Sequence, residues 1–226
     1  QGGRGPARGM TFRFRPALSV FTLAGVAILL SLGTWQLQRL EWKRALIDKI
    51  EARVDAEPIA FETAHRRWSD GQDTEYTPVV AEGVYRHDLE AHVFGTFDGA
   101  AGYYIFTPLE IADAASNPTS FMYVNRGFAP QSLKARDARS DGLVEGQVIV
   151  RGLFRSAETD VGLAALFRPA DNPAENTWFR REPTAFAEAA GIEAPPVYVD
   201  SFGAENTCEW PKGGATRLAF NNRHLE

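Results

Sequence analysis

The stretch that decides the architecture is ALSVFTLAGVAILLSLGTW, which runs from Ala17 to Trp35. Its 19 residues include no charged side chain. At about 1.5 Å per residue, a helix of this length covers about 28 Å, close to the thickness of the hydrocarbon core of a bilayer. A cleaved signal peptide is the alternative, because Ser31-Leu32-Gly33 resembles a cleavage site of small residues. Length and lack of charge favour one transmembrane helix over residues 17–35.

The charges beside this helix do not decide its orientation. Orientation follows the number of Lys and Arg residues near the two ends of a span. These are Arg4, Arg8, Arg13 and Arg15 before the helix, and Arg39, Lys43, Arg44 and Lys49 after it. The count is a tie, but a large domain is translocated largely regardless of such charges. We therefore expect the basic segment 1–16 inside the cell and the bulk of the chain outside.

Residues 36–56 are predicted to continue the helix as an amphipathic segment. Trp35, Trp42, Leu46, Ile50 and Val54 recur at spacings that keep them near one helical face, and much of the remainder is polar. No Gly or Pro interrupts the chain between Thr34 and Val54, so one unbroken helix is expected. The two tryptophans lie where aromatic side chains favour the lipid–water boundary.

Beyond Pro58 the pattern predicts a second region, a domain over residues 57–221. Short runs rich in β-branched and aromatic residues, separated by turn residues, are typical of strands. The runs are Val79–Tyr85, Ala91–Phe94, Tyr103–Leu109, Phe121–Phe128, Gln147–Phe154 and Pro196–Phe202. Only one further helix is predicted, from Pro183 to Ala190, with Gly191 after its end. The fold class is therefore α+β, with mainly antiparallel strands that curl toward a barrel.

Two pentapeptides in this domain echo each other. Residues 82–86 read EGVYR and residues 151–155 read RGLFR, each with a glycine inside a predicted strand. A glycine at such a place indicates a bulge or bend. We expect Gly83 and Gly152 to occupy equivalent places in the sheet.

Composition and motifs exclude several functions. A net charge of −5 argues against nucleic acid as a partner. A lone cysteine, Cys208, cannot form an internal disulfide or a zinc site of paired cysteines. The chain contains none of the nucleophile-elbow, zinc-protease, phosphate-loop or dinucleotide-binding motifs. We therefore expect a protein that is not an enzyme.

Two sets of side chains have alternative interpretations. His87 and His92, five residues apart, form a conceivable metal pair, but no third His or Cys supports it. Arg126 is suited either to bidentate binding of an anion or to pairing with a carboxylate of the domain.

A series of motifs in this order resembles the Surfeit locus protein 1 family. They are Trp35-Gln36, Arg39-Leu40 and Trp42-Lys43, then Gly102-Tyr103 and Thr107-Pro108-Leu109, then Val124-Asn125-Arg126-Gly127-Phe128 with Pro130, and lastly Asn222-Arg223-His224-Leu225. The resemblance covers the chain from about residue 16 to its last residue. Each motif is modest alone, and their order and spacing make the resemblance specific.

The resemblance implies a membrane-bound assembly factor for haem–copper cytochrome c oxidase. It implies an inner-membrane protein with a periplasmic domain, in which residues 222–226 begin a second transmembrane helix beyond Glu226. The implied role is to insert haem a into the catalytic subunit of the oxidase or to stabilise that subunit. The implied partners are the bilayer, the catalytic subunit and haem a synthase.

The same resemblance places a haem ligand at His224. A neutral imidazole is a usual axial donor to haem iron, and Arg217 and Arg223 are suited to pair with the propionates. A histidine that merely marks the membrane boundary is the alternative. Two other functions also stay open: a permanent accessory subunit of a respiratory complex, and a membrane-tethered enzyme or ligand-binding domain.

Overall fold

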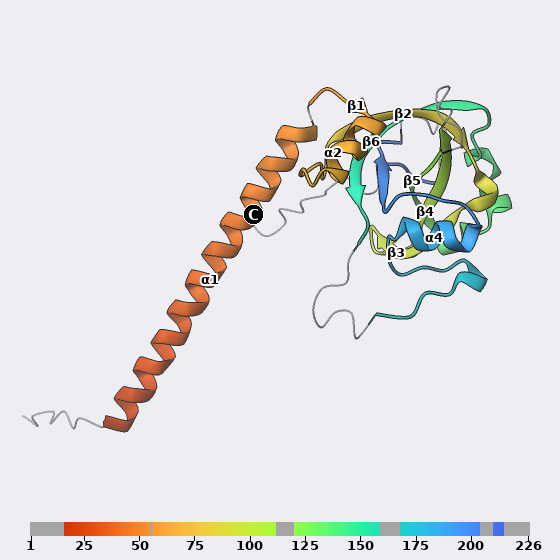
Figure 1. Cartoon of the computed structure of the whole chain (residues 1–226). Coiled ribbons are helices and arrows are strands. Elements are labelled where there is room, and N and C mark those ends of the chain that lie inside the picture. Colours follow the sequence, from red (N-terminus) through yellow and green to blue (C-terminus); the bar gives the residue numbers. More distant parts are fainter. Residues whose placement is uncertain (1–15, 55, 112–119, 159–167, 204–209, 215–226) are drawn as a thin grey trace, which may run out of the picture. The chain divides into compact units, whose positions relative to one another are not determined.

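The computed structural model describes residues 16–54, 56–111, 120–158, 168–203 and 210–214 (Figure 1). The chain divides into two compact units, residues 1–49 and residues 50–226. We describe each unit separately. The sequence-derived limits at residues 16, 35, 56 and 221 stay predictions.

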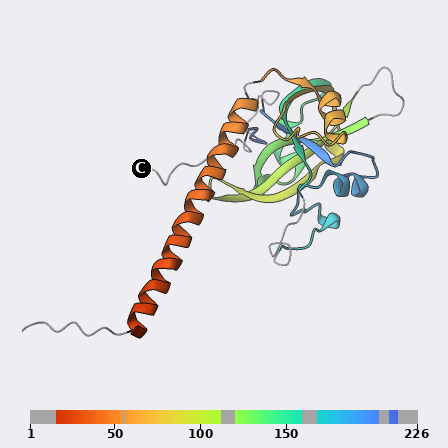
Figure 2. The same ribbon diagram turned by 60° about the vertical axis from the view of Figure 1, so that its left-hand side comes forward.

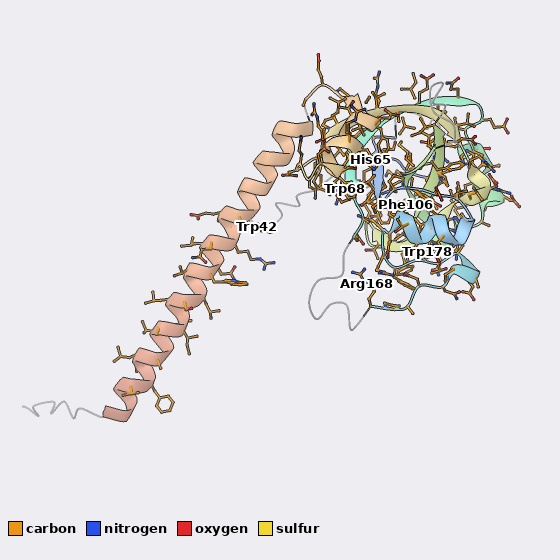
Figure 3. All side chains as sticks on the ribbon, in the orientation of Figure 1. Trp42, His65, Trp68, Phe106, Arg168 and Trp178 are labelled. Atoms are coloured by element: carbon orange, nitrogen blue, oxygen red, sulfur yellow. The ribbon has the colours of Figure 1, made fainter. Side chains whose placement is uncertain are left out.

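The first unit is dominated by the helix α1, which spans Pro16–Val54 without interruption. This confirms the prediction of one unbroken helix through residues 35–54. Its segment Val20–Trp42 is long and apolar enough to cross a membrane, by length and composition. Its large apolar side chains are exposed, including Trp42, which projects from the helix in Figure 3. Beyond Trp42 the side chains of α1 lie outside the described residues, so the amphipathic character of 36–56 stays a prediction.

The second unit is built on one mixed sheet of seven strands. The strands are β1 (Ile59–Ala60), β2 (Pro78–Tyr85), β3 (Ala91–Phe97), β4 (Ala100–Ile111), β5 (Ser120–Pro130), β6 (Gln147–Ser156) and β7 (Val197–Ser201). Their order is β1-β2-β6-β7-β5-β4-β3, and β2 also pairs with β4. This additional pairing closes β2, β6, β7, β5 and β4 into a ring, and the strands curve around a shared interior in Figures 1 and 2.

The six strands expected from the sequence are all present, but their directions are more mixed than expected. Most neighbouring pairs are antiparallel, whereas β1–β2 and β5–β7 are parallel. A parallel partner requires a long connection that returns the chain to the same end of the sheet. The chain between β5 and β7, which contains the antiparallel strand β6 and the helix α4, supplies that connection for the pair β5–β7.

Within the described residues of the domain, two helices pack on the sheet, and the sequence pattern predicted only one of them. The helix α4 (Pro183–Ala190) has the predicted bounds, and Gly191 caps it in a left-handed conformation. The helix α2 (Phe61–Ser69) was missed, so the expectation of one further helix was wrong. The described part of the domain also contains the short 3₁₀ helices η1 (His87–Leu89), η2 (Gln131–Leu133), η3 (Arg136–Gly142) and η4 (Pro173–Glu175).

The domain has two main apolar clusters, one on each face of the curled sheet. The interior cluster takes side chains from all five ring strands and from Phe61 and Ala64 of α2. The outer cluster joins the other faces of β4, β5 and β7 to Trp178 and Phe186, so that α4 covers this face. Side chains alternate between the two clusters, as in Val124 (interior) and Tyr123 (outer). Figure 3 shows Phe106 and Trp178 of the outer cluster within the domain.

The echo between the two pentapeptides has a structural counterpart. Gly83 of β2 pairs with both β6 and β4, and Gly152 of β6 pairs with both β2 and β7. Each glycine therefore lies where its strand passes from one neighbour to the next. A Cβ at Gly83 would overlap the carbonyl oxygen of Glu110, and one at Gly152 would overlap that of Asp200. This close approach requires glycine at both corners of the ring.

Candidate functional site

The motif Asn125-Arg126-Gly127 lies on β5 in the middle of the domain. Successive side chains of a strand point to opposite faces. Asn125 accordingly faces the outer cluster, and Arg126 continues the interior column beyond Val124. Both side chains are almost fully buried. The strand thus carries polar groups into two different buried networks.

Arg126 belongs to a cluster of five ionisable side chains, which we call the ionic cluster. Its members are His87, Glu90, His92, Arg126 and Arg139. The Glu90 carboxylate accepts hydrogen bonds from Arg139, and its Oε1 lies 4.0 Å from Nη1 of Arg126. Nη2 of Arg126 donates to the carbonyl oxygen of Gly142 at 2.6 Å, and its guanidinium lies 4.7 Å from the ring centre of Tyr85.

This geometry decides between the two interpretations of Arg126. The guanidinium is fully buried and faces a carboxylate of its own domain. Burial raises the pKa of Glu90, but His87, His92 and Arg139 outweigh burial and hold its pKa well below the ordinary value. Glu90 is therefore ionised at neutral pH and compensates the charge of two buried arginines.

The two histidines of the cluster both contact Glu90. Nδ1 of His87 lies 3.3 Å from Oε1 of Glu90, and Nε2 of His92 lies 3.7 Å from its Oε2. Nε2 of His87 also lies 2.9 Å from the carbonyl oxygen of Val144. Within the described residues, no group of three or more His, Cys, Asp or Glu side chains is arranged to hold a metal ion.

Asn125 enters a second network on the outer face. Its Nδ2 donates to Oδ1 of Asp200 at 2.8 Å, and Nη1 of Arg155 donates to the other carboxylate oxygen at 3.1 Å. Arg155 also donates to Glu75 at 2.6 Å. Burial raises the pKa of Asp200, and the charges of Arg155 and Arg181 offset this only in part. This network ties β5, β6 and β7 together across the ring.

Gly127 has a steric role that links β5 to a later segment, residues 210–214, which we call the strap. Phe128 and Lys212 exchange backbone hydrogen bonds of 3.2 and 2.8 Å. Gly127 has φ +120°, and a Cβ there would overlap the carbonyl oxygen of Lys212. Gly142, whose carbonyl binds Arg126, similarly leaves room for the carbonyl of Trp210. The strap therefore packs directly on the backbone that surrounds the ionic cluster.

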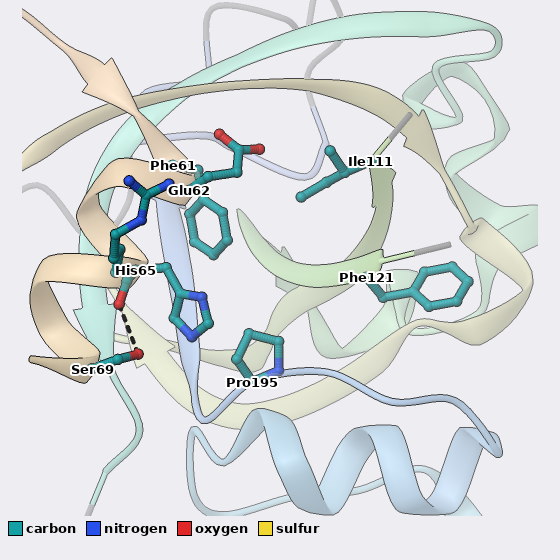
Figure 4. Close-up of a pocket in the computed structure, with 8 residues that line it drawn as sticks. Phe61, Glu62, His65, Ser69, Ile111, Phe121 and Pro195 are labelled. Atoms are coloured by element: carbon teal, nitrogen blue, oxygen red, sulfur yellow. Dashed lines mark hydrogen bonds between the residues drawn. The ribbon is translucent and has the colours of Figure 1, made fainter. Parts of the chain in front are cut away.

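A pocket of about 390 Å³ lies beside α2 (Figure 4). Its apolar walls come from Phe61, Ile111, Phe121 and Pro195, and His65 extends into it between Phe61 and Pro195. The volume falls in the range of small-molecule sites, which also combine apolar walls with few polar groups.

The structure describes some of the remaining residues of the sequence motifs. Tyr103 is buried, and Nζ of Lys134 lies 4.7 Å from its ring centre. Trp35, Gln36 and Arg39 belong to α1, where the Arg39 guanidinium lies 5.4 Å from the Trp35 ring centre. Four residues lie outside the described residues, namely Cys208 and the candidate haem-site residues Arg217, Arg223 and His224.

Sequence reasoning missed Glu90 and Arg139, and it did not place His65 at a pocket. Glu90 and Arg139 are 49 positions apart and have no local pattern that joins them. His65 offered a weak signal, because Phe61, Ala64 and Trp68 form a helical stripe around it.

The fold and its buried networks define the class of protein. An N-terminal apolar helix, long enough to cross a membrane, precedes an α+β domain organised around two buried ionic networks. Within this class the chain belongs to the SURF1 family, whose family model matches residues 23–226. The predicted resemblance is thus confirmed, and the matched range includes every element of the domain.

Relatives with established names support this assignment. Surfeit locus protein 1 of Homo sapiens is 31% identical over 211 residues, which cover 86% of this chain and 66% of the human protein. The Rattus norvegicus protein of the same name is 30% identical, over 92% of this chain and 69% of its own. A SURF1-like protein of Monosiga brevicollis is 33% identical, over 86% and 74%. The chain spans about two thirds of the length of the mammalian relatives.

Proposed function

We propose that this protein is a membrane-bound assembly factor for haem–copper cytochrome c oxidase. It assists the insertion of haem a into the catalytic subunit, or stabilises that subunit, without catalysing a reaction itself. The observation that carries the proposal is the family match, which extends from α1 through the whole domain. The domain supports the absence of catalysis, because the motif residues Asn125 and Arg126 contact other side chains of the domain in buried networks. Such contacts stabilise the fold.

Haem a is the proposed cofactor, handled transiently. Haem iron requires an axial donor such as a neutral imidazole, and its propionates favour guanidinium groups. We propose His224 as such a donor, with Arg217 and Arg223 for the propionates. When bound, haem a would be held for transfer, and the chain would bind and orient it.

Deleting the gene in its native cell tests the assembly role. We expect a several-fold loss of a-type haem absorption in the membranes and of oxidase activity, both restored by the full-length chain. Purified mature oxidase should lack this protein, which separates an assembly factor from an accessory subunit. Unchanged a-type haem and oxidase activity in the deletion strain would contradict the proposal.

We also propose that the domain lies on the periplasmic face of the inner membrane. Reporter fusions after Ser140 measure this directly. Alkaline phosphatase fused there should be active, because it folds outside the cytoplasm, and a cytoplasmic fluorescent reporter should be dark. A fusion of each reporter before Pro16 serves as the control and should give the opposite pair of signals. An active cytoplasmic reporter after Ser140 would reverse the orientation.

A further inference from the structure

The outer face of the sheet is covered over only part of its width. The outer cluster, with α4 and Trp178, packs on β3, β4, β5 and β7. On the outer face of β2 and β6, which lie side by side (Figure 1), Val84 is 41% exposed and Ile149 is 56% exposed. Phe202, directly after β7, is 38% exposed. Large apolar side chains that gather on one exposed face are typical of an interaction surface.

The alternation of side chains along the strands places these residues on one face. Val79 and Ala81 of β2, and Val148 and Val150 of β6, belong to the interior cluster. The residues between them and next to them therefore face outward. Together with Phe202, whose backbone N–H donates to the carbonyl oxygen of Arg151, they form a set that we call the outer patch: Val80, Glu82, Val84, Ile149, Arg151 and Phe202.

The two charged side chains of the outer patch have opposite signs. Glu82 and Arg151 are both exposed. Among the described residues, neither side chain takes part in a hydrogen bond or an ion pair. In the register of β2 and β6, Val80 lies opposite Arg151 and Glu82 lies opposite Ile149. The two charges therefore occupy one diagonal of a four-residue unit, and two apolar side chains occupy the other.

This arrangement is complementary to itself. A two-fold axis that lies in the plane of the face, along the diagonal from Val80 to Ile149, exchanges the positions of Glu82 and Arg151. Glu82 of each copy then faces Arg151 of the partner subunit, and each Ile149 meets its own counterpart near the axis. Such an isologous contact, in which the same patch serves both subunits, is the commonest interface of homo-oligomers.

We propose that two copies of this chain associate through the outer patch, with Glu82 and Arg151 paired reciprocally. The apolar side chains Val84, Ile149 and Phe202 exclude water from the contact, and the two ion pairs fix its register. Three exposed apolar side chains from each copy make a small interface by the standard of stable dimers. Under the membrane-bound role proposed above, α1 confines the copies to one plane and raises their effective concentration.

The test measures crosslinking of the full chain in phosphatidylcholine vesicles at a low ratio of protein to lipid. Ile149→Cys, made in a chain that carries Cys208→Ser, is treated with a short bismaleimide and read on a denaturing gel. Cysteine is itself a small apolar residue, so this substitution keeps the character of the patch. Most of the chain should run as a dimer. Arg67→Cys, exposed on α2 outside the patch, is the matched control and should stay mainly monomeric.

Reversing the charges tests the pairing. Added to Ile149→Cys, either Glu82→Arg or Arg151→Glu should lower the dimer yield by about tenfold or more, because like charges then face each other. The two reversals combined should restore the yield, because the reciprocal pairs form again with their signs exchanged. Both side chains are exposed, so thermal melts of all variants should show a folded domain.

Each contrary result overturns the inference. Equal crosslinking of Ile149→Cys and Arg67→Cys would show chance collisions in the bilayer. Full crosslinking in both single reversals would exclude the charge pairs, and a combined variant that stays monomeric would exclude the two-fold arrangement. A monomeric chain whose Ile149→Asp variant lowers oxidase activity in the native cell would assign the patch to another protein. None of these results bears on the deletion strain, which decides the assembly role separately.

Discussion

Replacing Glu90 by glutamine is expected to lower the free energy of unfolding by ~3–5 kcal/mol. The substitution keeps the shape of the side chain but removes the carboxylate charge that faces Arg126 and Arg139. Both guanidinium groups are fully buried, so water cannot compensate the charge that is lost. Breaking a buried pair is more costly than losing an exposed one, because a buried charge is left alone.

Chemical denaturation of the full chain in detergent measures this loss. Glu110→Gln is the matched control, because Glu110 pairs with Arg86 at 3.4 Å and both side chains are more than a third exposed. We expect that control to change stability by about 1 kcal/mol or less. Equal effects of the two substitutions would show that the ionic cluster contributes no more than a surface pair.

The pH dependence follows from the direction of the Glu90 pKa shift. The folded state holds the pKa below its ordinary value of 4.5, so ionised Glu90 contributes stability above about pH 4.5. That contribution is lost as pH falls from 4.5 through the folded-state pKa. The stability difference between the unmodified chain and Glu90→Gln should therefore be full at pH 7 and shrink below pH 4.5.

Much of the architecture could be predicted because its signals are local. The uncharged run from Ala17 to Trp35 and the lack of Gly or Pro after Thr34 indicated the helix α1. Short runs rich in β-branched and aromatic residues marked the six longer strands, and Pro183 with Gly191 marked both ends of α4. Each of these features depends on neighbours within a few positions, and such features can be predicted from a single sequence.

What could not be predicted depends on distant partners. The two-residue strand β1 is too short for any periodicity, and the parallel direction of β7 is set by the connection that precedes it. No local sequence pattern marks Glu90 as a buried acid. Its two arginine partners, Arg139 and Arg126, come from η3 and β5. The helix α2 was missed because its stripe of three apolar residues spans only two turns.

Replacing Gly127 by alanine is expected to detach the strap from β5 and to destabilise the domain by ~3 kcal/mol or more. Two effects add at this position. A φ of +120° is strained for any residue with a Cβ, at a cost of order 1–3 kcal/mol. The new Cβ would also overlap the carbonyl oxygen of Lys212. Backbone atoms on both sides cannot move aside without breaking the hydrogen bonds between Phe128 and Lys212.

Gly146→Ala separates the two effects, because Gly146 also has a positive φ, +79°, but no atom lies within 4 Å of a Cβ built there. That control should cost about 1–2 kcal/mol through backbone strain alone. Hydrogen exchange on the full chain gives the sharper measurement, because Gly127→Ala should remove protection of the amides of Phe128 and Lys212, and Gly146→Ala should leave both protected. If both variants keep this protection and lose equal stability, the strap does not depend on the space beside Gly127. If only Gly127→Ala loses this protection, the space beside this glycine keeps the strap packed near the ionic cluster. Gly142 connects the two, because its Cα lies close to the carbonyl oxygen of Trp210 and its own carbonyl oxygen accepts a hydrogen bond from Arg126.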